Sequence, residues 1–178
     1  MLDTLLILAA NYLWYAIIVI AVIHLLTLPR REQIRSLMLA AIVLPLVYVV
    51  SVIAGALYYD PRPFVVGHFV PLIPHKASNG FPSDHVLWSA AISAITFSTK
   101  RYVSLILWLL TLLVGASRVY LGVHHPIDIV GSIAIAIVVS VLVHLLLRRI
   151  NLFDYWTLVR ATQPSTQSSN SKEPRQRL

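Results

Sequence analysis

Five long apolar stretches constrain the fold of this chain more than any other feature of its sequence. They run over residues 5–28, 36–58, 83–99, 102–121 and 126–147, and the third is the shortest. A membrane-spanning helix needs about 20 mostly apolar residues. The stretches are unbroken rather than alternating, which favours helices over the strands of a membrane barrel. We therefore expect an all-α fold: a polytopic transmembrane helical bundle of five spans, or of six if residues 59–82 dip back into the membrane.

The composition supports the same fold class. Hydrophobic residues make up 58% of the 178 residues and charged residues 12%, against about 45–50% and about 25% in soluble domains. This excess argues against a soluble globule, a disordered chain and a fibrous repeat. Because the chain has no cysteine, disulfides, thiolate metal sites and a cysteine nucleophile are excluded.

The basic residues are distributed unequally between the two sides of such a bundle. Connecting segments alternate sides, so residues 59–82 and 119–126 share one side, which holds only Arg62, Lys76 and Arg118. Because basic segments stay in the cytoplasm, we expect these two segments to face the exterior or periplasm and the C-terminus to be cytoplasmic. The net charge of +7 is then a signal of membrane topology, and nucleic-acid binding is not expected. The opposite side holds the remaining eleven basic residues: Arg30, Arg31, Arg35, Lys100, Arg101, Arg148, Arg149, Arg160, Lys172, Arg175 and Arg177.

The chain divides into one large region and two small ones. Residues 1–150 contain all the expected spans and form the transmembrane domain. Residues 151–160 carry three aromatic side chains, which predicts a segment anchored at the membrane interface. Residues 161–178 are rich in Ser, Gln, Thr and Pro, a composition typical of a disordered tail.

Three polar clusters lie at span ends that meet on one membrane face. Ionisable groups at membrane depth are functional candidates. The first cluster, Asp60-Pro61-Arg62-Pro63, follows the second span. Its prolines end the helix and restrict the backbone around Arg62, whose guanidinium is a planar fork of donors suited to phosphate. Taken alone, the cluster could also be a basic interface anchor.

The second cluster, Phe81-Pro82-Ser83-Asp84-His85, opens the third span. Ser83 is a candidate N-cap, and the first helical turn would aim free N–H groups outward as an anion site. His85, in that turn, could donate a proton to a bound group. A capped helix start with a surface histidine is the alternative interpretation.

The third cluster joins Ser117-Arg118 to His124 and Asp128 with fixed spacing. Pro126 suits the first turn of the fifth span, so Asp128 follows His124 by about one turn. The carboxylate could then hold one ring nitrogen and leave the other as a nucleophile. The alternative is that Asp128 only caps the helix.

The three clusters resemble the motifs of the type 2 phosphatidic acid phosphatase superfamily of membrane lipid phosphatases. Its pattern appears here as Arg62-Pro63, as Pro82-Ser83-Asp84-His85, and as Ser117-Arg118 through His124 to Asp128, the last matching in full. The resemblance covers about residues 36–147. The chain departs from the family at Gly55, where a lysine is expected, and at Asp84, which replaces glycine. The Pro-Ser-Asp-His and Arg-Pro-Phe-Val forms resemble the branch that dephosphorylates undecaprenyl diphosphate.

The resemblance implies a role for each motif residue. His124 is the implied nucleophile that forms phosphohistidine, Asp128 holds its tautomer, and His85 protonates the leaving oxygen. Arg62, Arg118 and Ser83 are the implied phosphate-binding residues. Lys76 is a candidate to replace the absent lysine, and Asp84 has no assigned role. No metal and no cofactor is expected, because the arginines supply the cations.

Other functions remain open at this point. The substrate could instead be phosphatidylglycerol phosphate, phosphatidic acid or another lipid phosphate. A small anion transporter or channel would also use outward arginines and histidines, although five spans are few and no repeat is visible. A histidine-rich metal sensor lacks close ligand spacing. The sequence does not fix the oligomeric state.

Overall fold

The computed structural model describes residues 1–149 and is helical, without named strands over that range. The six helices are α1 (Leu2–Thr27), α2 (Arg30–Leu57), α3 (Pro63–Val66), α4 (Asp84–Phe97), α5 (Arg101–Tyr120) and α6 (Pro126–Arg149). The predicted all-α membrane bundle is confirmed. The expected interfacial segment 151–160 and tail 161–178 lie outside the described residues.

Four helices, α1, α2, α5 and α6, are long and apolar enough to cross a membrane. The third expected span corresponds to α4, which has only 14 residues. At 1.5 Å per residue it is about 21 Å long, against about 30 Å for the hydrocarbon core. Residues 59–82, the candidate sixth span, contain only the four-residue α3. In the described chain, the bundle therefore consists of four helices of spanning length around a shorter one.

Helix α4 lies at the centre of the bundle because small and hydroxyl side chains let its neighbours approach closely. Its buried residues include Ser89, Ala90, Ala91 and Ser93. The Ser93 hydroxyl lies 3.2 Å from that of Thr111 on α5, and Ser104 of α5 donates a 2.7 Å hydrogen bond to the Ser93 carbonyl. Apolar clusters pack α4 against α2 and α6 on one side and against α1 and α5 on the other.

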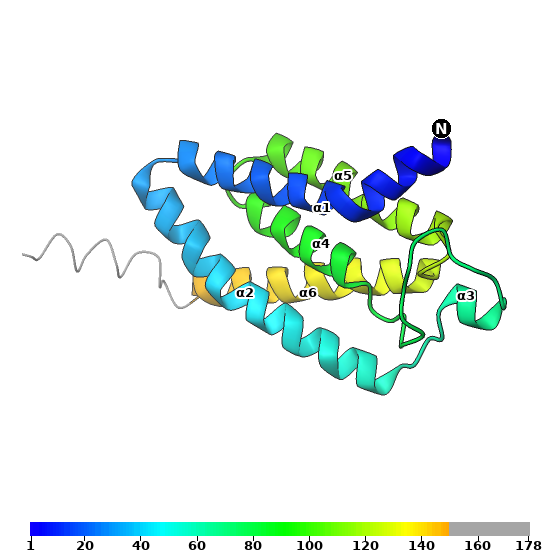
Figure 1. Cartoon of the computed structure of the whole chain (residues 1–178). Coiled ribbons are helices and arrows are strands. Elements are labelled where there is room, and N and C mark those ends of the chain that lie inside the picture. Colours follow the sequence, from blue (N-terminus) through cyan, green and yellow to red (C-terminus); the bar gives the residue numbers. More distant parts are fainter. Residues whose placement is uncertain (150–178) are drawn as a thin grey trace, which may run out of the picture.

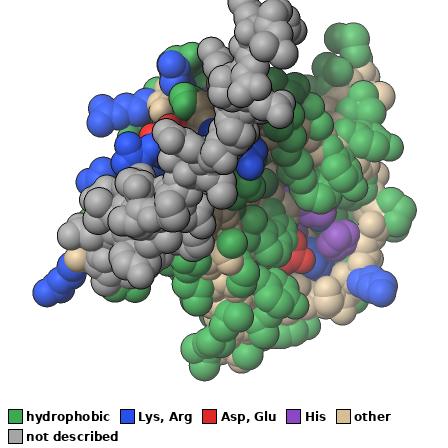
Figure 2. Space-filling view, turned by 90° about the vertical axis from the view of Figure 1, so that its left-hand side faces the viewer, with side chains coloured by type: hydrophobic (Ala, Val, Ile, Leu, Met, Phe, Trp, Pro, Cys, Tyr) green, Lys and Arg blue, Asp and Glu red, His purple; other side chains and the backbone are tan. Residues whose placement is uncertain are grey.

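The antiparallel helices bring four helix ends together at one end of the molecule. Figure 1 shows the end of α2, the start of α4, the end of α5 and the start of α6 beside α3 and its loops. These are the ends that carry the three polar clusters. Seen from the opposite end, Lys and Arg side chains gather near the viewer, and the histidines lie deeper in the molecule (Figure 2). The sequence correctly predicted which helix ends meet.

Asn79 fastens the loop before α4 to the end of α2. Its side-chain Oδ1 accepts the backbone N–H groups of Asp60 at 2.9 Å and of Phe81 at 3.0 Å. Its Nδ2 donates to the carbonyls of Gly55 at 2.8 Å and of Tyr58 at 3.1 Å. One amide side chain therefore satisfies backbone groups on both segments and fixes the entry to α4.

The packing of the end of α2 on this loop leaves little room for a side chain at position 55. A Cβ atom on Gly55 would lie 3.0 Å from the Phe81 carbonyl oxygen, which is tighter than ordinary van der Waals contact. The end of α2 packs directly on the loop at this point. This position therefore contributes no cation to the site end of the bundle.

We expect Asn79→Ala to lower the free energy of unfolding by roughly 2–3 kcal/mol, since three partly buried backbone groups lose their partner at about 1 kcal/mol each. Asn79→Asp, which keeps the acceptor and loses the donor, should be intermediate. Thermal unfolding in detergent measures both. Ser78→Ala, at the exposed neighbouring position, is the matched control. An unchanged melting temperature for Asn79→Ala would contradict the role of this side chain.

Candidate active site

His124 and Asp128 form a buried pair at the junction of α5 and α6. Gly122, with φ +74°, lets the chain turn sharply between the two helices. Pro126 begins α6 as predicted, which places Asp128 in its first turn. The Nδ1 atom of His124 lies 3.1 Å from Oδ2 of Asp128, and the two residues are 3% and 0% exposed. The predicted histidine–carboxylate pair is therefore present in the structure.

Arg62 fixes which nitrogen of His124 carries the proton. Its Nη1 lies 2.8 Å from the Val123 carbonyl oxygen and 3.2 Å from Nε2 of His124. A guanidinium can only donate hydrogen bonds, so Nε2 presents a lone pair. The proton of the neutral ring is then on Nδ1, where it faces Asp128. This tautomer leaves Nε2 unprotonated, with its lone pair directed towards Arg62.

Burial keeps His124 neutral. Burial lowers the pKa of the His124 imidazole below its usual range. The hydrogen bond that His124 donates to Asp128 opposes that shift, and the charges of Arg62 and Arg118 add to it. A neutral imidazole is the reactive form of a nitrogen nucleophile. Arg62 is itself 8% exposed, and its pKa is lowered by burial although the nearby Asp128 and Asp84 oppose the shift.

Several buried polar atoms around this pair have no partner among the described residues. They are the possible donors Nε of Arg62, Nε of Arg118 and Oγ of Ser83, and, within the pair itself, the acceptor Oδ1 of Asp128. A buried donor without a hydrogen-bond partner destabilises the folded protein. These three donors come from three segments that meet at one end of the bundle, where they could bind the oxygens of an anion. Ser83 is the N-cap of α4 as predicted, yet its hydroxyl makes no capping hydrogen bond, which leaves it and the first-turn N–H groups available.

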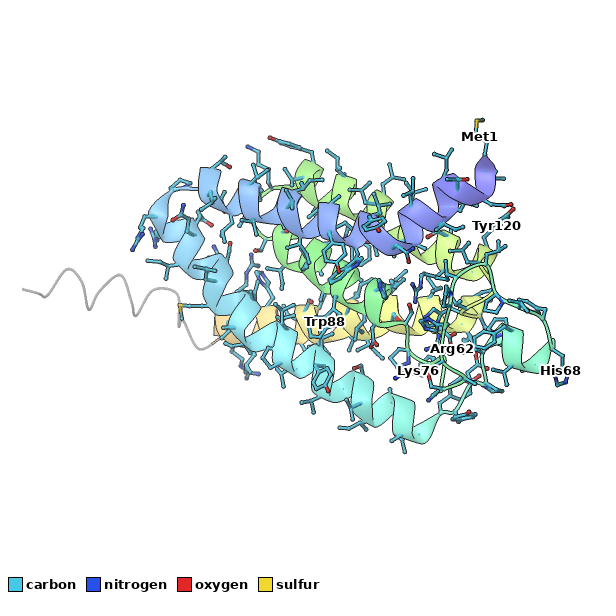
Figure 3. All side chains as sticks on the ribbon, viewed as in Figure 1. Met1, Arg62, His68, Lys76, Trp88 and Tyr120 are labelled. Atoms are coloured by element: carbon cyan, nitrogen blue, oxygen red, sulfur yellow. The ribbon has the colours of Figure 1, made fainter. Side chains whose placement is uncertain are left out.

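His85 lies in the first turn of α4, on the same side as the pair. Its ring packs edge-on against Trp14 of α1 with centroids 5.5 Å apart, and it interacts electrostatically with Arg118 and His124. Figure 3 shows Arg62 in this crowded region between the ends of the helices. Arg62, His85, Arg118 and His124 thus lie close together at one end of the bundle. The sequence analysis expected them on the same face of the membrane.

The two remaining sequence candidates occupy the margin of the site. Asp84 is exposed and close enough to interact electrostatically with both Arg62 and Arg118. It is therefore placed to orient these cations. Lys76 is exposed on the loop before α4 (Figure 3).

A second histidine–carboxylate pair lies beside the first. Nδ1 of His125 is 3.0 Å from Oδ2 of Asp60, and its backbone N–H donates to Oδ2 of Asp128 at 2.9 Å. Burial and the nearby Asp128 raise the pKa of Asp60. Potential ligand atoms of Asp60, His125 and Asp128 lie within 4.8 Å of one another, and in the structure they are engaged in these two pairs. The second pair connects the Arg62 loop to the His124 loop.

Three residues outside the three motifs also contribute to this region: Asn79, which sequence reasoning missed, and His75 and His125, which it placed on the outer side without a role in the phosphatase site. The Asn79-Gly80 dipeptide was available as a turn signal. The ring centroid of His75 lies 6.2 Å from that of His124. Nothing in local sequence marked His75 or His125 beyond their residue type, because the contacts that matter join segments far apart in the chain.

The chain matches the model of the PAP2 superfamily over residues 35–152. It is similar to undecaprenyl-diphosphatase BcrC of Bacillus subtilis, 38% identical over 53% of this chain and 49% of that protein, so it spans about half of that relative's length. It is also similar to the bacitracin transport permease protein BcrC of Bacillus licheniformis, 26% identical over 83% of this chain and 68% of that protein.

Its fold is similar to that of LpxE from Aquifex aeolicus. The TM-score is 0.63 at 24% identity, and the likeness covers 80% of this chain and 84% of that one. The family model covers more than half of the chain, including every residue of the site described above. This chain is therefore a member of the PAP2 superfamily, with the fold of a multi-pass membrane protein.

Proposed function

We propose that this protein is an integral membrane lipid phosphatase that transfers a phosphoryl group to His124 and then to water. The observation that carries the proposal is the buried His124, whose Nε2 lone pair is set by Asp128 and Arg62 beside unpaired guanidinium nitrogens. Phosphoryl transfer depends mainly on positioning and on neutralising charge. This site provides both.

In the first step, Nε2 of His124 attacks the terminal phosphorus. The N–P bond forms while the bond from phosphorus to the bridging oxygen breaks. The bound anion offsets the charge of Arg118 and favours the imidazolium form of His85, which gives its proton to that leaving oxygen. Arg62 turns from Nε2 to the phosphoryl oxygens, and Arg118 and Ser83 bind the others. Asp128 stabilises the positive charge that develops on the ring of His124.

In the second step, water attacks the phosphohistidine. His85, now neutral, takes a proton from the water as a general base, and the N–P bond breaks to release inorganic phosphate. His124 returns to its neutral form with its Nδ1 proton towards Asp128. The sum is one water consumed and one phosphate released per substrate. Each cationic role in the cycle is filled by a side chain of the chain itself.

We propose a polyprenyl diphosphate of the undecaprenyl type as the substrate. The similarity to undecaprenyl-diphosphatase BcrC of Bacillus subtilis supports this substrate. So does a stripe of incompletely buried side chains on α4, at His85, Trp88 and Ile92, which share one helix face by their spacing. The stripe leads from the site to an apolar cavity of about 150 Å³ lined by α1, α2 and α4. A long apolar tail would have contacts along this path.

Other lipid phosphates are the closest alternative. Phosphatidylglycerol phosphate and phosphatidic acid present the same terminal phosphoryl group to His124. Phosphate release from a panel of purified lipid phosphates and diphosphates in detergent separates these substrates.

A transporter or channel for a small anion is the alternative from another class, and the name of the Bacillus licheniformis relative favours it. Flux of an anion into liposomes without release of phosphate would support transport. Release of phosphate without flux would support the phosphatase.

We propose further that the site faces the exterior or periplasm and the C-terminus the cytoplasm. The support is the basic loop distribution: the site end of the bundle carries three of the fourteen Lys and Arg residues.

We expect His124→Ala to abolish phosphate release from undecaprenyl diphosphate, because no other group occupies the position of Nε2, while insertion and melting temperature stay close to wild type. Rapid quench with radiolabelled diphosphate should trap an acid-labile phosphoprotein in the wild type and none in the variant. His144→Ala, at the opposite end of α6, is the matched control. Normal turnover by His124→Ala would remove the nucleophile assignment.

Asp128→Asn should change the pH dependence of turnover. The carboxylate raises the pKa of His124 against the effect of burial, so its neutralisation lets that pKa fall further. Since protonation of His124 removes the nucleophile, the acidic limb of kcat/KM should move to lower pH, with a plateau about 100- to 10,000-fold below wild type. Titration of the substrate affects both proteins equally and cancels in the comparison. A limb that moves to higher pH would contradict the assignment.

The membrane orientation can be tested because the chain has no native cysteine. Ser78→Cys, on the loop at the site end, should react with an impermeant maleimide on intact cells. Lys100→Cys, between α4 and α5, should react only after the cells are permeabilised. The reverse pattern would overturn the proposed orientation and leave the proposed chemistry intact.

A further inference from the structure

We propose that His75 is a substrate-binding residue that contacts the second phosphate of a diphosphate and so distinguishes diphosphates from phosphate monoesters. The inference rests on the proposed phosphatase function and adds a specificity residue to it. His75 belongs to the loop between α3 and α4 and to none of the three polar clusters found in the sequence.

The position of His75 places it over the nucleophile. Its ring centroid lies 6.2 Å from that of His124, with an angle of 64° between the rings. It interacts electrostatically with Arg62, Arg118 and His85 as well. His75 is partly exposed, so it stands between the buried donors and the outside. A phosphoryl group bound at His124 would have His75 as a neighbour.

The packing around Gly55 explains why a cation is needed from this loop. Arg62 and Arg118 are the permanent cations that face His124, and the family's lysine position is closed by the Phe81 carbonyl. Lys76 adjoins His75 but is exposed, whereas the His75 ring faces that of His124. His75 is therefore better placed than Lys76 to take the role of the family's lysine.

The charge of His75 would respond to the substrate. Without an anion, burial, Arg62, Arg118 and His124 lower the pKa of His75 to about 4, so the ring is neutral. A bound anion offsets the two arginines and favours the imidazolium. A phosphate monoester carries at most two negative charges, which Arg62 and Arg118 match. A diphosphate carries about one more, and this additional charge gives His75 a partner.

The inference is tested by comparing two substrates in His75→Ala. We expect kcat/KM for undecaprenyl diphosphate to fall about 10- to 100-fold and that for phosphatidic acid, which carries a single phosphate monoester, by less than threefold. His75→Lys should recover most of the activity on the diphosphate. The matched control is His68→Asn, because His68 is exposed near the far end of α3 (Figure 3) and Asn tolerates its φ of 52°. Equal losses on both substrates, or no loss, would overturn the inference.

A binding measurement separates failure of the inference from failure of the proposed function. Inorganic pyrophosphate should raise the melting temperature of the wild type more than orthophosphate at the same concentration. His75→Ala should keep the orthophosphate shift and lose the additional pyrophosphate shift, whether or not the protein turns over lipid. If His75→Ala retains the additional shift, His75 does not bind the second phosphate. If the wild type releases phosphate from no lipid in the panel, the proposed function fails instead.

Discussion

The hydrogen bonds of the Arg62 guanidinium hold the functional end of this bundle together. Nη1 binds the backbone at Val123 and the ring of His124, and Nη2 donates to the Asn79 carbonyl at 3.2 Å. One side chain thus connects the end of α2, the loop before α4 and the loop before α6. A buried cation is costly unless it is hydrogen bonded or paired. Its carbonyl partners and the nearby carboxylates reduce that cost, and Nε remains without a partner among residues 1–149.

The fold of the site end follows from a small number of sequence features. Proline positions at 61, 63, 82 and 126 end or begin helices, and the spacing of Arg118, His124 and Asp128 fits a turn between two helices. These are local effects, and a local pattern can reveal them. The common face of the clusters followed from the alternation of helices alone. The sequence therefore predicted which helix ends meet and which polar residues those ends carry.

The sequence did not predict the contacts that depend on long-range packing. The length of α4 was overestimated, because its apolar stretch continues through residues that turn before α5. Asn79 and His75 lie in a polar, proline-rich loop whose path is fixed by the end of α2 and by the site itself. The exclusion of a side chain at Gly55 also depends on a carbonyl 26 positions away, at Phe81. Contacts between residues so far apart in the sequence can be identified only from the packed helices.

The short length of α4 has a consequence for how a lipid reaches the site. If its inner end lies level with Lys100 and Arg101 at one membrane surface, its N-terminus is about 9 Å short of the other surface, from the difference between about 21 Å and about 30 Å. The unpaired polar groups around Ser83 are then recessed below the plane of the surrounding headgroups. The lipid phosphate proposed as substrate would not have to leave the bilayer to react, because its charged end would move inward while its hydrocarbon stayed in the leaflet.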